Sequence, residues 1–123
     1  MAITVLIVDD NAQFLDAARV LLQREGLTVA GVASTGAEAL RQVSDLRPEV
    51  VLVDVFLGDE SGLELAQRLV EDGRSGRATV ILISTHAEDD LADLIATSPA
   101  AGFLQKAELS ADAVRRIIDQ QAP

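Results

Sequence analysis

The chain has 123 residues, of which 49% are apolar and none is Cys, Trp or Tyr, and its formal net charge is −10. This length favours one domain, residues 1–123, with a single core, and the lack of cysteine excludes disulfides and thiolate metal sites. The negative charge disfavours direct binding to nucleic acid or to anionic membranes.

The first four residues contain no basic segment of the kind that begins a signal peptide. No apolar run approaches the roughly 20 residues that are needed to cross a bilayer. We therefore expect a soluble, cytoplasmic protein that does not bind membranes.

Aliphatic runs alternate with helical patterns along the chain. The strands are predicted at residues 3–8, 27–33, 50–53, 80–83 and 102–105. The helices are predicted at about 11–25, from the Thr35 cap to before Pro48, and at about 62–72, 87–97 and 111–121. Strands that are apolar throughout are typical of a parallel sheet covered on both faces. Because parallel crossovers are right-handed, this order predicts a doubly wound α/β sandwich whose functional crevice lies beyond the carboxyl ends of the strands.

Several helix starts carry recognisable caps. Thr35 with Glu38, and Ser61 with Glu64, match the S/T-x-x-E capping box. Ser110 is a suitable cap for the last helix. These residues predict where the second, third and fifth helices begin.

Reactive side chains follow four of the five predicted strands. Asp9 and Asp10 end the first, Asp54 the third and Ser84 the fourth, and Lys106, the only lysine, ends the fifth. Three converging carboxylates need a cation or a proton, and oxygen ligands suit Mg²⁺ or Mn²⁺. A hydroxyl and an ammonium complete a pocket for a phosphoryl group, with an aspartate as nucleophile.

The simpler alternative is that these polar residues only cap the helices that follow, as Asp10 and Asn11 would for the first helix. The single lysine would then reflect a bias toward arginine, since the other nine basic residues are Arg. Their placement at one edge of the sheet favours a shared site.

With this set and spacing, the whole chain resembles the receiver domain of two-component response regulators, of the chemotaxis-regulator type. Gly62, eight residues past Asp54, also falls where the family has glycine. The resemblance implies a flavodoxin-like (βα)5 fold with five parallel strands in the order 2-1-3-4-5. It also implies that Asp54 is the phosphoacceptor.

The resemblance further implies a metal-binding role for four residues. Asp10 would ligate Mg²⁺ (or Mn²⁺) directly and Asp9 mainly through water. Asp54 would contribute a carboxylate oxygen and Phe56 its backbone carbonyl.

Three more residues receive roles from the resemblance. Ser84 would donate its hydroxyl to a phosphoryl oxygen and Lys106 would pair with another. Phe103 occupies the place of the switch aromatic, which turns inward when Ser84 moves toward the phosphate.

The implied reaction is transfer from phosphohistidine of a sensor histidine kinase, or from a phosphotransfer protein, followed by slow autodephosphorylation. The chain would not be an enzyme beyond these self-directed steps. Phosphorylation would repack the face of the fourth helix, fifth strand and fifth helix, which would meet an output partner, a fused effector domain or a second copy of the chain.

The sequence departs from the family pattern at a few positions. Ala107 replaces the proline that usually follows the lysine, so a trans peptide is expected there, and Gly58 replaces another common proline. Phe56 and His86 lie two residues past Asp54 and Ser84. We hypothesise that Phe56 slows hydrolysis of the phosphorylated form, and we expect His86 to be exposed without an evident Asp or Ser partner.

Two other functions remain open from the sequence. The first is an aspartate-nucleophile phosphohydrolase of the haloacid dehalogenase type. Such enzymes carry a D-x-D motif at the first strand, whereas Asp9 and Asp10 are adjacent here. A non-phosphorylated receiver-like binding module usually lacks one of the site residues, and all are present here. Glycine-rich nucleotide-binding motifs are absent from the sequence.

Overall fold

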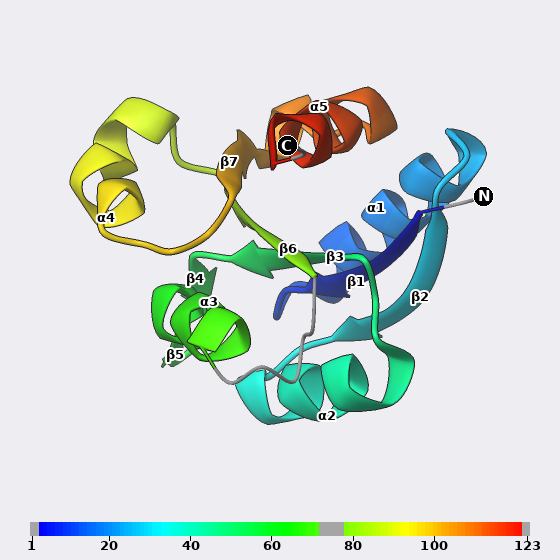
Figure 1. Ribbon diagram of the computed structural model, residues 1–123, viewed down its shortest axis with the longest axis horizontal. Helices are drawn as coiled ribbons and strands as arrows, with labels where there is room; N and C mark the ends of the chain where they lie inside the picture. Colours follow the sequence, from blue (N-terminus) through cyan, green and yellow to red (C-terminus); the bar gives the residue numbers. More distant parts are fainter. Residues whose placement is uncertain (1–2, 72–77, 122–123) are drawn as a thin grey trace.

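The computed structural model describes residues 3–71 and 78–121 (Figure 1). Its main sheet has five parallel strands, β1 (Thr4–Val8), β2 (Thr28–Ala33), β3 (Val50–Asp54), β6 (Thr79–Ser84) and β7 (Gly102–Gln105). Their order is β2-β1-β3-β6-β7, which confirms the predicted order 2-1-3-4-5 and the doubly wound fold.

In the part of the chain that the structure describes, five α-helices connect or follow these strands, and all five were predicted. They are α1 (Ala12–Arg24), α2 (Gly36–Leu46), α3 (Gly62–Glu71), α4 (Ala92–Ala96) and α5 (Ala111–Gln121). The predicted end of the third helix at residue 72 lies outside the described residues. Within the described ranges, no helix is both long enough and apolar enough to span a bilayer.

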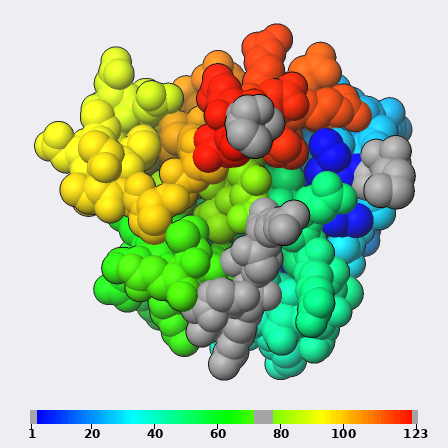
Figure 2. All heavy atoms as spheres, viewed as in Figure 1, coloured from blue at the N-terminus to red at the C-terminus, as the bar shows by residue number. Residues whose placement is uncertain are grey.

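The prediction of one helix over 87–97 was wrong in part. A 3₁₀ turn, η1 (Glu88–Leu91), comes first, and only the short α4 follows. Ala87 offers no capping side chain to this start, so the initial N–H groups lack the partner that a longer α-helix has. No residue of α4 is fully buried, and α4 (yellow) protrudes at the side of the molecule (Figure 2).

The predicted caps are present at the other helix starts. The Thr35 hydroxyl accepts from the Glu38 N–H at 3.2 Å and the Ser61 hydroxyl from the Glu64 N–H at 3.2 Å. The Ser110 hydroxyl accepts from the N–H of residue 113 at 3.0 Å. These bonds satisfy backbone donors that the first helical turn leaves free.

Two apolar cores lie on opposite faces of the sheet. Along β1, Val5 and Ile7 pack with α1 and α5, whereas Leu6 and Val8 pack with α2 and α3. Figure 1 shows the same division, with α1 and α5 on one side of the strands and α2 and α3 on the other. Because both faces are covered, each central strand is apolar except at its ends, as the sequence pattern indicated.

A small hairpin that the sequence did not predict follows β3. Strands β4 (Phe56–Leu57) and β5 (Glu60–Ser61) pair antiparallel. Gly58 turns between them with φ +59°, in the left-handed region that glycine adopts without strain. The Glu60 carboxylate also accepts from the Gly36 N–H, at 3.1 and 3.3 Å for its two oxygens. The hairpin is thereby tied to the N-terminus of α2.

Candidate phosphoryl-transfer site

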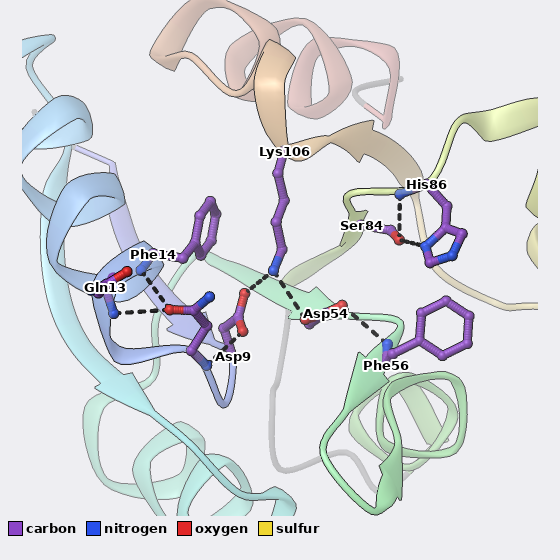
Figure 3. A network of polar contacts seen from close by, with 9 residues as sticks. Asp9, Gln13, Phe14, Asp54, Phe56, Ser84, His86 and Lys106 are labelled. Carbon is purple, nitrogen blue, oxygen red and sulfur yellow. Dashed lines mark hydrogen bonds and ion pairs between the residues drawn. The ribbon is translucent and has the colours of Figure 1, made fainter.

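The candidate site lies at the carboxyl edge of the main sheet, where parallel strands deliver their last residues together. Asp9 follows β1 directly, Asp54 is the last residue of β3, and Ser84 is the last residue of β6. Lys106 follows β7 and begins η2 (Lys106–Glu108), which is one turn of 3₁₀ helix. Figure 3 shows that the Lys106 side chain extends to Asp9 and Asp54.

Two of the three carboxylates are buried. Asp9 is 0% exposed and Asp54 is 6% exposed, whereas Asp10 is exposed. A backbone N–H fixes one oxygen of each buried acid: that of Asn11 binds Asp9 Oδ1 at 2.9 Å and that of Phe56 binds Asp54 Oδ1 at 3.0 Å. The second oxygen of each acid is left to face the lysine.

The Lys106 ammonium joins the two buried acids. Its Nζ lies 2.5 Å from Asp9 Oδ2 and 3.1 Å from Asp54 Oδ2. The peptide bond to Ala107 is trans, as expected, and no cis bond occurs among the described residues. The usual proline is therefore not required for the lysine to reach Asp54.

Burial raises the pKa of Asp54 above its ordinary value, and the negative charge of Asp9 acts in the same direction. The Phe56 N–H and Lys106 oppose this shift without cancelling it. Burial alone would lower the pKa of Lys106, but its hydrogen bonds and charge pairs with Asp9 and Asp54 raise that pKa overall. The charge of the lysine is therefore favoured by its two acidic neighbours, whereas burial makes ionisation of Asp54 less favourable than in water.

The acidic cluster has the chemistry of a hard-cation site. Asp9, Asp10 and Asp54 can each offer one carboxylate oxygen, and these oxygens all lie within 4.8 Å of one another. Mg²⁺ and Mn²⁺ prefer oxygen ligands and use few protein carboxylates, with water completing the shell. The residues present therefore fit such an ion, and its charge would offset the Asp9 charge, which adds to the effect of burial on the Asp54 pKa.

Ser84 is held by its own loop. It is 1% exposed, its hydroxyl accepts from the His86 N–H at 3.0 Å, and it lies 3.3 Å from His86 Nδ1. His86 is exposed, as expected, and the structure gives it a serine partner that was not evident from the sequence. A residue two positions further on can reach back because the chain turns at the end of β6.

The rings of Phe56 and His86 are in contact at the rim, with centroids 5.0 Å apart. Phe56 is 49% exposed. Phe103, the candidate switch residue, is half-buried on β7 and packs against the core on the α2–α3 side. It lies outside the Asp–Lys network, so its switching role stays a prediction.

The sequence reasoning missed one neighbour of the lysine. Phe14, on the first turn of α1, places its ring centroid 4.5 Å from Lys106 Nζ. The sequence marked Phe14 only as an apolar position of the first helix. No spacing rule connects the first turn of α1 to the end of β7.

The family described as "Response regulator receiver domain" matches residues 5–118. The response regulator GacA of Pseudomonas viridiflava is 32% identical over 116 residues, which cover 94% of this chain and 53% of that protein. The nitrate/nitrite response regulator NarL of Escherichia coli (strain K12) is 32% identical over 104 residues, which cover 84% of this chain and 47% of that protein. The chain spans about half the length of these curated relatives.

The fold comparison agrees with the sequence comparison. The signal receiver domain of a modulated diguanylate cyclase from Desulfovibrio desulfuricans G20 matches with a TM-score of 0.79 at 32% identity. The match covers 98% of this chain and 93% of that one.

Proposed function

The chain belongs to the response regulator receiver domain family of two-component systems, and on this premise we propose that it accepts a phosphoryl group onto Asp54 in a reaction that depends on Mg²⁺ or Mn²⁺. The donor is phosphohistidine of a sensor histidine kinase or of a phosphotransfer protein in the cytoplasm. The observation that carries this proposal is the buried pair Asp9–Asp54 with the Lys106 ammonium between them.

In the proposed reaction, a carboxylate oxygen of Asp54 attacks the phosphorus in line with the leaving imidazole. The O–P bond forms as the P–N bond of phosphohistidine breaks, and the imidazole keeps the electron pair of that bond. Lys106 already lies 3.1 Å from Asp54 Oδ2, so it offsets negative charge on the transferring group without a large rearrangement. The Phe56 N–H holds the other oxygen and fixes the plane of the carboxylate.

Asp9, Asp10 and the Asp54 carboxylate itself would hold the divalent ion, together with the Phe56 backbone carbonyl. When bound, the ion supplies positive charge to the phosphoryl oxygens. Ser84 would leave His86 and donate its hydroxyl to a phosphoryl oxygen. This exchange of partners is the proposed start of the switch, with Phe103 following Ser84 inward.

The altered face would consist of α4, β7 and α5. The curated relatives that the chain matches are about twice its length. We propose that this face contacts an output partner, a fused effector domain or a second phosphorylated copy. Repacking here costs little because α4 is short and has no fully buried residue.

The direct test is incubation of the protein with acetyl phosphate and Mg²⁺, followed by intact mass measurement. We expect a gain of one phosphoryl group, which peptide mapping assigns to Asp54, and no gain when a chelator is present. A folded protein that gains none, or gains it at another residue, would contradict the proposal. Steady release of phosphate over many turnovers would favour the phosphohydrolase alternative.

A second prediction concerns the lifetime of the phosphorylated form. Replacing Phe56 with Asn is expected to shorten the half-life several-fold, because the Phe56–His86 ring pair shields the rim of the site from water and an amide can orient a water molecule for attack. The measurement is loss of the phosphoryl mass over time after the donor is removed. The control Phe56→Leu keeps an apolar side chain and should remain long-lived; an Asn variant that outlives wild type would refute the shielding role.

A further inference from the structure

We propose that Phe14 is a positioning residue for Lys106. The Phe14 ring keeps the lysine ammonium next to the carboxylate of the proposed phosphoacceptor, Asp54. This inference rests on the proposed function, since it assigns a residue of α1 to the same transfer site. The inference adds an aromatic residue to a site that otherwise consists of the aspartates, Ser84 and Lys106.

The ammonium has neighbours of two kinds. Two are the carboxylate oxygens of Asp9 and Asp54, and the third is the Phe14 ring, 4.5 Å from Nζ to the centroid. Figure 3 shows the ring beside the lysine side chain, at the end of the network away from Ser84 and His86. At this distance an ammonium is attracted to the negative face of the ring, and more strongly where water is excluded. The Lys106 side chain is only 13% exposed.

Apart from the two carboxylates, little fixes the long side chain of Lys106. The residue begins η2, which is one 3₁₀ turn without a side-chain cap, and an exposed alanine follows it. A lysine stem has four rotatable carbons and no planar group, so it does not orient itself as a guanidinium would. A ring that contacts the ammonium reduces the positions that the side chain can adopt.

Asp9 also helps to hold the backbone of the first turn of α1, which carries the Phe14 ring. Asp9 Oδ1 accepts from the Asn11 N–H at 2.9 Å, and Asn11 Oδ1 accepts from the N–H of Phe14 at 3.2 Å. Asp9 Oδ2 pairs with Lys106. The contacts therefore form a closed circuit that runs Asp9, Asn11, Phe14, Lys106 and back to Asp9. A shift of the first turn of α1 would move both the ring and the carboxylate that hold the ammonium.

A purely structural role for Phe14 makes a different prediction. The ring is half-buried and also packs against the core on the α1–α5 side. If it served only as packing, a leucine of similar volume would replace it with little effect on the lysine. The two roles are separated by a measurement made on the lysine itself.

The chain has one lysine, so protein labelled with ¹³C,¹⁵N-lysine gives one set of side-chain signals that needs no assignment. In wild type, the ring should shift the ε-methylene protons upfield. We expect Phe14→Leu to lose this shift and Phe14→Tyr to keep it. In parallel, the initial rate of phosphoryl uptake from acetyl phosphate with Mg²⁺ should fall about 10-fold in Phe14→Leu and return in Phe14→Tyr.

Leu21→Ala, on an exposed part of the same helix, controls for a general weakening of α1 and should leave both readouts unchanged. If Phe14→Leu does not fold, Phe14→Met supplies a flexible apolar replacement. An unshifted lysine signal in wild type, or an unchanged uptake rate when the shift is lost, would overturn the positioning role. Failure of wild type to take up phosphate would instead refute the proposed function, while the lysine signal would still report on the contact.

Discussion

Replacing Asp54 with Asn is expected to abolish phosphoryl uptake from acetyl phosphate while the fold is retained. The amide oxygen can still accept the Phe56 N–H that now binds Asp54 Oδ1 at 3.0 Å, so the local backbone keeps its partner. The amide lacks the anionic oxygen that attacks phosphorus. Intact mass after incubation with donor and Mg²⁺ provides the measurement, and no phosphorylated species should appear.

Asp59→Asn is the matched control, because Asp59 is an exposed acid on the hairpin that follows β3 and lies outside the acidic cluster. This control should take up one phosphoryl group as wild type does. Uptake by Asp54→Asn at the wild-type rate would show that another residue is the acceptor.

The same variant carries a prediction for stability. Burial raises the pKa of Asp54 in the folded protein above the ordinary value of 3.8, so the folded state binds this proton more tightly than the unfolded chain does. Ionising Asp54 therefore costs folding free energy as the pH rises above 3.8, and the full cost is present above the folded pKa. Asn removes that cost.

In chelator at neutral pH, Asp54→Asn should unfold at a higher temperature than wild type, as followed by far-ultraviolet circular dichroism. The difference should shrink as the pH falls toward 3.8. Mg²⁺ should narrow it as well, because the ion stabilises the native state that binds it and Asn is the weaker ligand. A less stable Asn variant under metal-free conditions would show that the Lys106 pair outweighs the cost of burial.

Most of the fold could be predicted because its signals are local. The apolar strands, the caps at Thr35, Ser61 and Ser110, and the right-handed crossovers each depend on a few neighbouring residues or on a general rule. The fourth helix was predicted over 87–97, but residues 88–91 form the 3₁₀ turn η1, and Ala87 at its start offers no capping side chain. The β4–β5 hairpin was missed because two-residue strands have no detectable period.

For the site, the sequence predicted which strand ends would meet, since all parallel strands end at the same edge. It could not predict partners that depend on side-chain direction. The Ser84–His86 contact follows from a turn after β6, and the Phe14–Lys106 contact joins residues from opposite ends of the chain. Both need three-dimensional coordinates, because neither has a spacing that sequence rules recognise.

The structure explains why glycine is needed at position 62. Gly62 is the first residue of α3, and its N–H donates to the Val55 carbonyl at 3.0 Å. A Cβ at this position would lie 1.7 Å from the Asp54 carbonyl oxygen and 2.7 Å from the Asp54 carbonyl carbon. The obstruction is the backbone of Asp54, the proposed phosphoacceptor, which cannot rotate aside as a side chain could. Only glycine lets α3 begin this close to β3.

Gly62→Ala is therefore expected to destabilise the fold by about 3 kcal/mol or more, which lies at the upper end for overpacking and corresponds to a fall of roughly 10 °C in Tm for a domain of this size. Gly31→Ala is the matched control: its new Cβ would meet the ends of the Gln42 and Leu46 side chains rather than backbone, and these can shift at the cost of weakening the Gln42 hydrogen bond to the Val32 carbonyl. Thermal unfolding of both variants decides the question. Equal stabilities would mean that the β3–α3 connection relaxes around the methyl group, and the close approach of α3 to Asp54 would then not be what requires glycine.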